Sequence, residues 1–189
     1  MIKNKTDKIR LNRFIAMCGV CSRRKADDLI KKGVVTVNNS IVNSLGSQVS
    51  IKDAVCVKGK QVFPENKKYI LLNKPKGYIT TMSDEKGRKT VVSLIQHSCK
   101  ERLVPVGRLD KDTTGLLLFT NDGLLAKKLT HPKYEVKKIY NVTLDRAVLT
   151  KDINSISKGL LLEDGLAQVD NIKRIADSNK KINIEIHIG

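Results

Sequence analysis

The chain has 189 residues, of which 40% are hydrophobic and 29% are charged, so it can bury a core and is not a disordered polypeptide. Its formal net charge is +17, from 36 Lys and Arg against 19 Asp and Glu. Such an excess repels itself in a compact fold and favours a polyanionic partner, although a solvated basic surface without a partner is the alternative.

The basic excess is spread along the chain rather than confined to a tail. Residues 1–66 carry 13 basic and 5 acidic side chains, and residues 67–189 carry 23 and 14. Both parts would therefore meet the anion, which points to a long nucleic acid more than to a small phosphate ligand. No apolar run reaches the length of a membrane span, and Met1 to Arg10 lack the apolar core of a signal peptide. We expect a cytoplasmic protein without a membrane partner.

Two short helices are predicted at the start of the chain. Residues 9–18 carry apolar side chains at helical spacing. Ser22 stands at the N-cap position of a second helix over residues 23–32, and Gly33 is placed to end that helix in a left-handed conformation.

A β-hairpin is predicted next, because the valines of residues 34–37 lead into the turn signal Asn38-Asn39 and then into Ile41-Val42. Residues 54–57 form a further short β-run. The sequence becomes polar and loses its periodicity towards residue 66, where we place a domain boundary.

The remainder of the chain alternates short strands with short helices. Predicted strands cover residues 69–72, 78–82, 103–106, 116–119, 140–144 and 182–188, and predicted helices cover residues 91–95, 124–129 and 151–158. We expect the strand at 69–72 to be buried, and the strand at 116–119 is apolar throughout. The pattern predicts an α+β fold with a mixed, largely antiparallel sheet.

The four cysteines include a C-x-x-C pair, Cys18 and Cys21, whose spacing is also used by zinc sites and by thioredoxin-like redox sites. A structural zinc needs two more ligands, and neither a second pair nor a nearby histidine is present. We therefore expect reduced thiols and no metal.

Three cations occupy the first turn of the second predicted helix, namely Arg23, Arg24 and Lys25. Cations are unfavourable beside a helix N-terminus unless an anion completes the site, because the helix dipole is positive there. A phosphate would meet this requirement, and solvated side chains are the alternative. The cations that would widen the patch are Arg10, Arg13, Lys31 and Lys32.

The first fifty residues resemble the αL RNA-binding module, which is shared by a small-subunit ribosomal protein and several RNA-modifying enzymes. The resemblance rests on residues 9–16, 19–27, 29–30 and 33–38. It implies an αL RNA-binding domain over residues 8–66 that holds structured RNA through its backbone and shape.

A polar turn, Gly107-Arg108-Leu109-Asp110, lies between apolar β-runs, which is a common place for reactive groups. If the turn is extended, Arg108 and Asp110 share one face. Arg108 would then keep the Asp110 carboxylate ionised, as nucleophilic or general-base chemistry requires. A structural ion pair is the alternative.

This turn also belongs to a set of motifs that resembles the RsuA/RluB group of pseudouridine synthases. The motifs follow one another in the order of that group, at residues 74–77, 107–118, 120–123 and 138–140. The resemblance implies a pseudouridine synthase domain over residues 67–189, acting as a monomer on ribosomal RNA, preferably of the large subunit. It implies no cofactor.

The resemblance also assigns roles to single residues. Asp110 matches the catalytic nucleophile, and Arg108 would position it. Tyr140 matches an active-site tyrosine, whose ring could stack on the uracil, although a core-facing tyrosine is the alternative reading. Lys74 and Lys76 are expected to contact RNA phosphates.

Members of the group continue past the last predicted strand with a basic segment that helps to form the cleft, whereas this sequence stops at Gly189. We therefore expect the C-terminal part of the domain to be missing, which leaves the activity of the chain open. A non-catalytic RNA-binding or ribosome-associated protein is the first alternative. A DNA-binding regulator is the second, although no recognition-helix pattern supports it.

Overall fold

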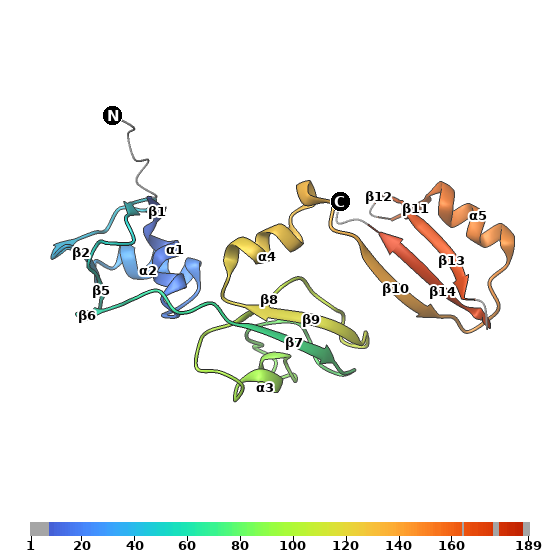
Figure 1. Ribbon diagram of the computed structural model, residues 1–189, viewed down its shortest axis with the longest axis horizontal. Coiled ribbons are helices and arrows are strands. Elements are labelled where there is room, and N and C mark those ends of the chain that lie inside the picture. The colour runs from blue at the N-terminus through green and yellow to red at the C-terminus, as the bar shows by residue number, and fades with distance from the viewer. Residues whose placement is uncertain (1–7, 164, 176–177, 187–189) are drawn as a thin grey trace. The chain divides into compact units, whose positions relative to one another are not determined.

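The computed structural model describes residues 8–163, 165–175 and 178–186. Its contacts divide the chain into two compact units, one up to Gly123 and one from Leu124 onward. Figure 1 shows both units, with most of their helices and strands labelled. Within the described ranges, no helix is both long and apolar enough to cross a membrane. The predicted end of the last strand, at His187 and Ile188, lies outside the described residues.

The two predicted N-terminal helices are confirmed as α1, Leu11–Met17, and α2, Arg23–Lys31. α1 begins later than predicted because Ile9–Arg10 forms strand β1 and pairs with β4, Gln48–Val49. The Ser22 hydroxyl caps α2 by accepting a hydrogen bond from the Lys25 N–H at 3.3 Å. Gly33 follows α2 with φ +67°, the left-handed conformation expected of it.

The predicted hairpin is confirmed as β2, Val35–Val37, and β3, Ser40–Ile41. Asn38 and Asn39 form its turn with φ values of 49° and 67°, which suit the right-handed twist of paired strands. β5, Val55–Val57, and β6, Lys60–Gln61, complete an antiparallel sheet in the order β3-β2-β5-β6.

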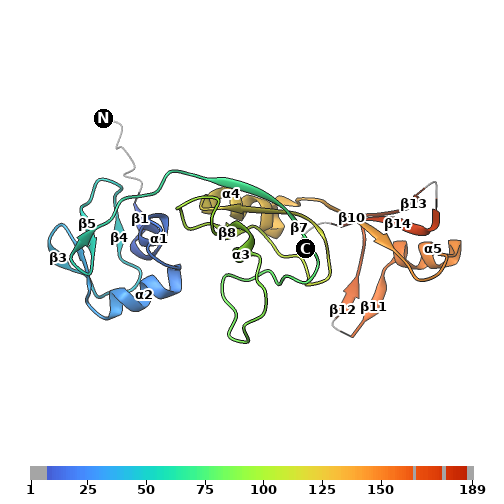
Figure 2. The same cartoon turned by 90° about the horizontal axis from the view of Figure 1, so that it is seen from below.

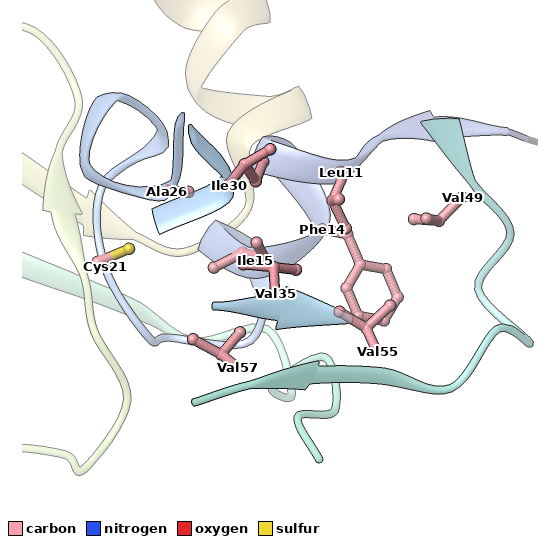
Figure 3. Packing of buried hydrophobic residues seen from close by; sticks show 10 residues of the cluster. All are labelled: Leu11, Phe14, Ile15, Cys21, Ala26, Ile30, Val35, Val49, Val55 and Val57. Carbon is pink, nitrogen blue, oxygen red and sulfur yellow. The ribbon is translucent and has the colours of Figure 1, made fainter. Parts of the chain in front are cut away.

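One face of each N-terminal helix contributes to a compact core, shown in Figure 3. Phe14 and Ile15 of α1 meet Ile30 of α2 and the valines of β2 and β5. The side chains in this core are Leu11, Phe14, Ile15, Cys21, Ala26, Ile30, Val35, Val49, Val55 and Val57. Burial of these apolar groups is what holds such short helices, which would be marginal in isolation.

A second sheet has the order β7-β9-β8, built from Tyr69–Lys74, Gly115–Thr120 and Val104–Pro105. The prediction that residues 69–72 form a buried strand is wrong for one face, since Leu71 is 64% exposed. Leu116 of the apolar strand β9 is likewise 72% exposed. Alternate residues of each strand point to opposite faces, and only one face packs against the core that includes helix α3, Val92–Ile95.

The strand predicted at residues 78–82 does not form. Ile79 makes an isolated bridge with Thr90, and the N–H of Thr81 bonds back to the carbonyl of Ile79. The Thr80 hydroxyl is also engaged, with the backbone of Leu109. These local and side-chain hydrogen bonds replace the strand ladder that the apolar composition suggested.

The second unit contains most of α4, Gly123–Thr130, followed by a 3₁₀ turn, η1, Pro132–Tyr134. Its main sheet has the order β10-β14-β13, and a separate hairpin joins β11 and β12, as Figure 2 shows. The remaining bounds are β10 Lys138–Thr143, α5 Thr150–Lys158, β11 Leu160–Leu162, β12 Gly165–Ala167, β13 Asn171–Ile175 and β14 Ser178–Ile186.

The predicted α+β class with a largely antiparallel sheet is confirmed, since the named strands pair antiparallel throughout the described ranges. The core of residues 11–57 is separate from the core of α3 and its sheet. This separation supports a domain boundary after residue 66, which remains a prediction because the contacts divide the chain only at residue 123.

Candidate functional site

The Gly107-Arg108-Leu109-Asp110 turn leads from β8 to β9 as a loop whose two ends are glycines with positive φ. Gly107 has φ 79° and Gly115 has φ 135°, conformations that side chains with a Cβ rarely adopt. Leu109 packs partly buried against the core of α3, whereas Arg108 and Asp110 are exposed on either side of it. The loop therefore displays the Asp110 carboxylate at the surface from an anchored backbone.

Lys74, the last residue of β7, provides that anchor. Its side chain is fully buried, with 0% exposure. The Nζ donates to the carbonyls of Asp110 at 2.8 Å, Lys111 at 3.1 Å and Thr113 at 2.8 Å, and it lies 3.2 Å from the carbonyl of Pro75. The prediction that Lys74 contacts an RNA phosphate is therefore wrong, because its ammonium group is enclosed by protein.

An ammonium group suits this position because it presents three N–H donors from one atom. A buried cation is costly unless it is hydrogen-bonded, and here the surrounding carbonyl oxygens supply that compensation. The Thr113 carbonyl has no other donor in the described residues, while those of Asp110 and Lys111 also accept from the N–H groups of Thr113 and Gly77. Lys74 thus holds three backbone carbonyls of the Asp110 loop in one arrangement.

Thr80 is a second anchor, which the sequence did not reveal. Its hydroxyl donates to the Leu109 carbonyl at 2.6 Å and accepts from the Leu109 N–H at 3.2 Å. The N–H of Gly77 adds a bond to the Lys111 carbonyl at 2.8 Å. Residues 74–80 therefore hold the loop around Asp110, and a contact across about thirty residues leaves no local sequence signal.

Arg108 and Asp110 form no ion pair within 4.0 Å, although both belong to the described chain. A neighbouring loop shows what such a pair looks like, because the Arg88 guanidinium bonds the Asp84 carboxylate through two nitrogens. Hydrogen bonding to Arg88 lowers the pKa of Asp84 below its ordinary value. The direct contact expected of Arg108 is absent here, so its role as a positioning residue stays a prediction.

Tyr140 lies in β10, within the second unit, opposite Ile184 of β14. It is half-buried and on the same side of the strand as Val142, which packs against the core of that unit. Half-buried and exposed residues alternate along β10, as expected for a strand with one packed face. The Tyr140 side chain therefore faces the core and remains partly exposed to solvent. A role for Tyr140 in the reaction stays a prediction.

The cations predicted for the RNA surface of the N-terminal module occupy four places. Arg23, Arg24 and Lys25 are exposed on the first turn of α2, as predicted. Lys31 and Lys32 are exposed at its other end, about 13 Å away for a nine-residue helix, so they would contact a different phosphate. The prediction that Arg10 lies on the first helix is wrong, because it lies in β1, where it is exposed. Arg13 lies on α1, half-buried.

The C-x-x-C pair has the environment of inert thiols. Burial, followed by the Glu65 carboxylate, raises the pKa of Cys18 to about 12. Burial also raises the pKa of Cys21 above its ordinary value. Redox cysteines require a lowered pKa, so the thioredoxin-like alternative loses its support. Over the described ranges, no group of three or more His, Cys, Asp or Glu side chains is placed to hold a metal.

Comparisons with protein families match both parts of the chain. The model for the RNA pseudouridylate synthase family matches residues 68–187. The model for the S4 domain matches residues 9–55, the part that contains the N-terminal helices and sheet.

Similar whole proteins agree with these matches. An uncharacterised RNA pseudouridine synthase of Aquifex aeolicus is 44% identical over 96% of this chain and 74% of its own length. The protein named ribosomal large subunit pseudouridine synthase B of Bacillus subtilis is 42% identical over 95% of this chain and 75% of its own length. A crystal structure of a pseudouridylate synthase, 30% identical, covers 94% of this chain and 76% of its own with a TM-score of 0.60.

Proposed function

Because the chain belongs to the RNA pseudouridylate synthase family, we propose that it converts a specific uridine of ribosomal RNA into pseudouridine, with Asp110 as the nucleophile. The observation that carries the proposal is the exposed Asp110 carboxylate, held on a loop whose carbonyls are fixed by Lys74 and Thr80. Nothing in the family match favours the non-catalytic alternative.

The reaction is an isomerisation that needs no external energy. The bond between uracil N1 and the ribose breaks, the base rotates, and a bond from uracil C5 to the ribose forms. The hydrogen of C5 leaves as a proton, and N1 takes up a proton, so substrate and product have the same composition. The target base must first leave its stack, at a cost of a few kcal/mol. A carboxylate held at a fixed position lowers the barrier because its orientation is already set before the RNA binds.

The surrounding side chains have supporting roles in this proposal. The Tyr140 ring would stack on the extruded uracil, since aromatic faces bind bases of any sequence. Arg108 lies two residues from Asp110, and Lys76 precedes Gly77, whose N–H bonds the Lys111 carbonyl. Both side chains are exposed and would contact the phosphates that flank the target. Arg108 could also approach Asp110 once RNA is bound, since neither side chain is held elsewhere by an ion pair in the described residues.

Ribosomal RNA of the large subunit is the proposed substrate, supported by the name of the Bacillus subtilis relative. The matched S4 domain would dock on folded RNA and deliver the second part of the chain to its uridine. We propose a monomer that works without cofactor or metal, in the cytoplasm, where ribosomal particles are assembled.

The proposed activity predicts the release of tritium from ribosomal RNA labelled at uracil C5. We expect release with large-subunit RNA and none with small-subunit RNA, because the C5 hydrogen is lost only where the base is rejoined through carbon. Release from small-subunit RNA alone would overturn the proposed substrate. No tritium release from either RNA, whether free or in assembling ribosomal particles, would favour a non-catalytic RNA-binding protein.

The first turn of α2 is expected to contribute phosphate contacts. The double variant Arg23→Gln/Arg24→Gln should weaken RNA binding and reduce the slope of log affinity against log salt by about 1.8, since each lost phosphate contact on a duplex contributes about 0.9. Filter binding over a salt series measures this slope. The matched control is Lys52→Gln/Lys60→Gln, which removes two exposed lysines of the same module from outside its helices. An equal change in both variants would mean that α2 binds only through net charge.

A further inference from the structure

A small cluster of aromatic and cationic side chains lies in the turn that joins α4 to β10, outside the Asp110 loop. Tyr134 ends η1, and the Lys133 ammonium lies 4.8 Å from the centroid of its ring. The His131 ring meets Tyr134 edge-on, with centroids 6.3 Å apart and an angle of 77° between the planes. All three residues are exposed.

The backbone holds this cluster in place. The N–H of Tyr134 donates to the His131 carbonyl at 3.1 Å, and the N–H of Glu135 donates to the Pro132 carbonyl at 2.8 Å. The Lys133 N–H donates to Nδ1 of His131 at 3.3 Å, which fixes the imidazole beside the tyrosine. The ring is therefore presented at the surface by an ordered turn, so little conformational entropy is lost when a ligand binds to it.

Packing does not account for the exposure of Tyr134. The ring is 40% exposed, and its hydroxyl forms no hydrogen bond with any other residue in the described chain. A tyrosine used in a core normally buries its ring and pairs its hydroxyl. The hydroxyl of Tyr69, in contrast, is paired, since it donates to Asp122 at 3.1 Å. With 4% aromatic residues and no tryptophan, this chain has few rings to expose.

The electrostatic surroundings of Tyr134 favour an anion. Residues 123–134 contain three exposed lysines, Lys127, Lys128 and Lys133, and no acidic residue. Within the described ranges, none of the three forms an ion pair. An exposed ring bordered by free cations is the arrangement with which proteins bind unpaired nucleotides, because the base stacks on the ring and the cations meet the backbone.

We propose that His131, Lys133 and Tyr134 bind one unpaired nucleotide of the RNA, with its base on the Tyr134 ring and its phosphate beside Lys133. This inference rests on the proposed function, in that RNA is the ligand. It adds a contact in the second unit that is separate from the α2 surface. This nucleotide would be recognised by stacking and charge rather than by base pairing.

The absence of tryptophan from the chain allows a direct test. The variant Tyr134→Trp carries one reporter, whose fluorescence should be quenched when a ten-nucleotide single-stranded RNA binds. The matched control is Leu161→Trp, in a strand of the same unit, where the replaced side chain is 85% exposed and residues 159–169 contain no basic residue. We expect saturable quenching of Tyr134→Trp alone. Fluorescence anisotropy of end-labelled RNA confirms that both variants bind.

Two further variants measure the size of the contact. Tyr134→Ala should weaken binding of the same oligonucleotide by about tenfold, whereas Tyr134→Phe, which keeps the ring, should bind within about twofold of the parent. Lys133→Gln should reduce the salt slope by about 0.7, and Lys151→Gln on α5 should leave it unchanged.

Three results would overturn the inference: no binding of the oligonucleotide to the parent chain, bound RNA without quenching of Tyr134→Trp, or equal quenching of the Leu161→Trp control. The outcome is independent of the proposed isomerisation. Quenching without tritium release would count against the enzyme activity alone, and tritium release without quenching would count against this site alone.

Discussion

Replacing Asp110 by alanine is expected to abolish tritium release, lowering turnover by at least about 10⁴-fold, the scale on which the loss of a covalent nucleophile acts. The loop itself should survive the change. The hydrogen bonds that involve Asp110 use its backbone carbonyl, which accepts from Lys74 and from the Thr113 N–H at 3.1 Å. Removal of the carboxylate should therefore leave RNA affinity and the free energy of unfolding close to those of the parent.

The matched control for Asp110 is Asp112→Ala, two residues along the same loop. Asp112 is also exposed, so its removal changes the local charge by the same amount. We expect the control to release tritium at nearly the parent rate, measured on large-subunit RNA under single-turnover conditions. Equal release by the parent and by Asp110→Ala would exclude Asp110 as the nucleophile. Equal loss in both variants would assign the effect to charge rather than to chemistry.

The second large effect is expected from Lys74→Met, which keeps the length of the side chain and removes its charge and donors. The carbonyls of Asp110, Lys111 and Thr113 would then be left without the buried donor that serves them now. The Asp110 and Lys111 carbonyls keep a backbone donor, the Thr113 N–H and the Gly77 N–H, whereas no other donor reaches the Thr113 carbonyl in the described residues. A buried acceptor left unsatisfied costs about 1–3 kcal/mol, so we expect the free energy of unfolding to fall by about that amount. Urea denaturation followed by circular dichroism measures this loss.

Lys76→Met is the matched control for Lys74, because Lys76 lies two residues away and is exposed. It should change the stability by less than about 0.5 kcal/mol, as surface substitutions do. Its effect should appear instead in RNA affinity and its salt dependence, if Lys76 contacts a phosphate. The reverse pattern, with Lys74→Met stable and Lys76→Met destabilised, would contradict the assignment of Lys74 as the anchor of the loop.

Local signals in the sequence determined the parts of the fold that depend on near neighbours. The spacing of apolar residues and the Ser22 cap predicted α1 and α2, and Asn38-Asn39 predicted the turn of the β2–β3 hairpin. The motif residues by themselves also indicated the family to which the chain belongs. These features could be read because their causes lie within a few residues of one another.

The tertiary structure alone decided how Asp110 is held. The sequence suggested that Lys74 meets RNA and that residues 78–82 form a strand, yet Lys74 is buried under the Asp110 loop and Thr80 bonds the backbone of Leu109. The carbonyls that accept from Lys74 lie 36 to 39 residues away, apart from that of Pro75. Lysines are seldom buried, and backbone carbonyls are the same in every residue, so no side-chain pattern marks such a partnership. It exists only once β7 and β9 have paired and brought the two segments together.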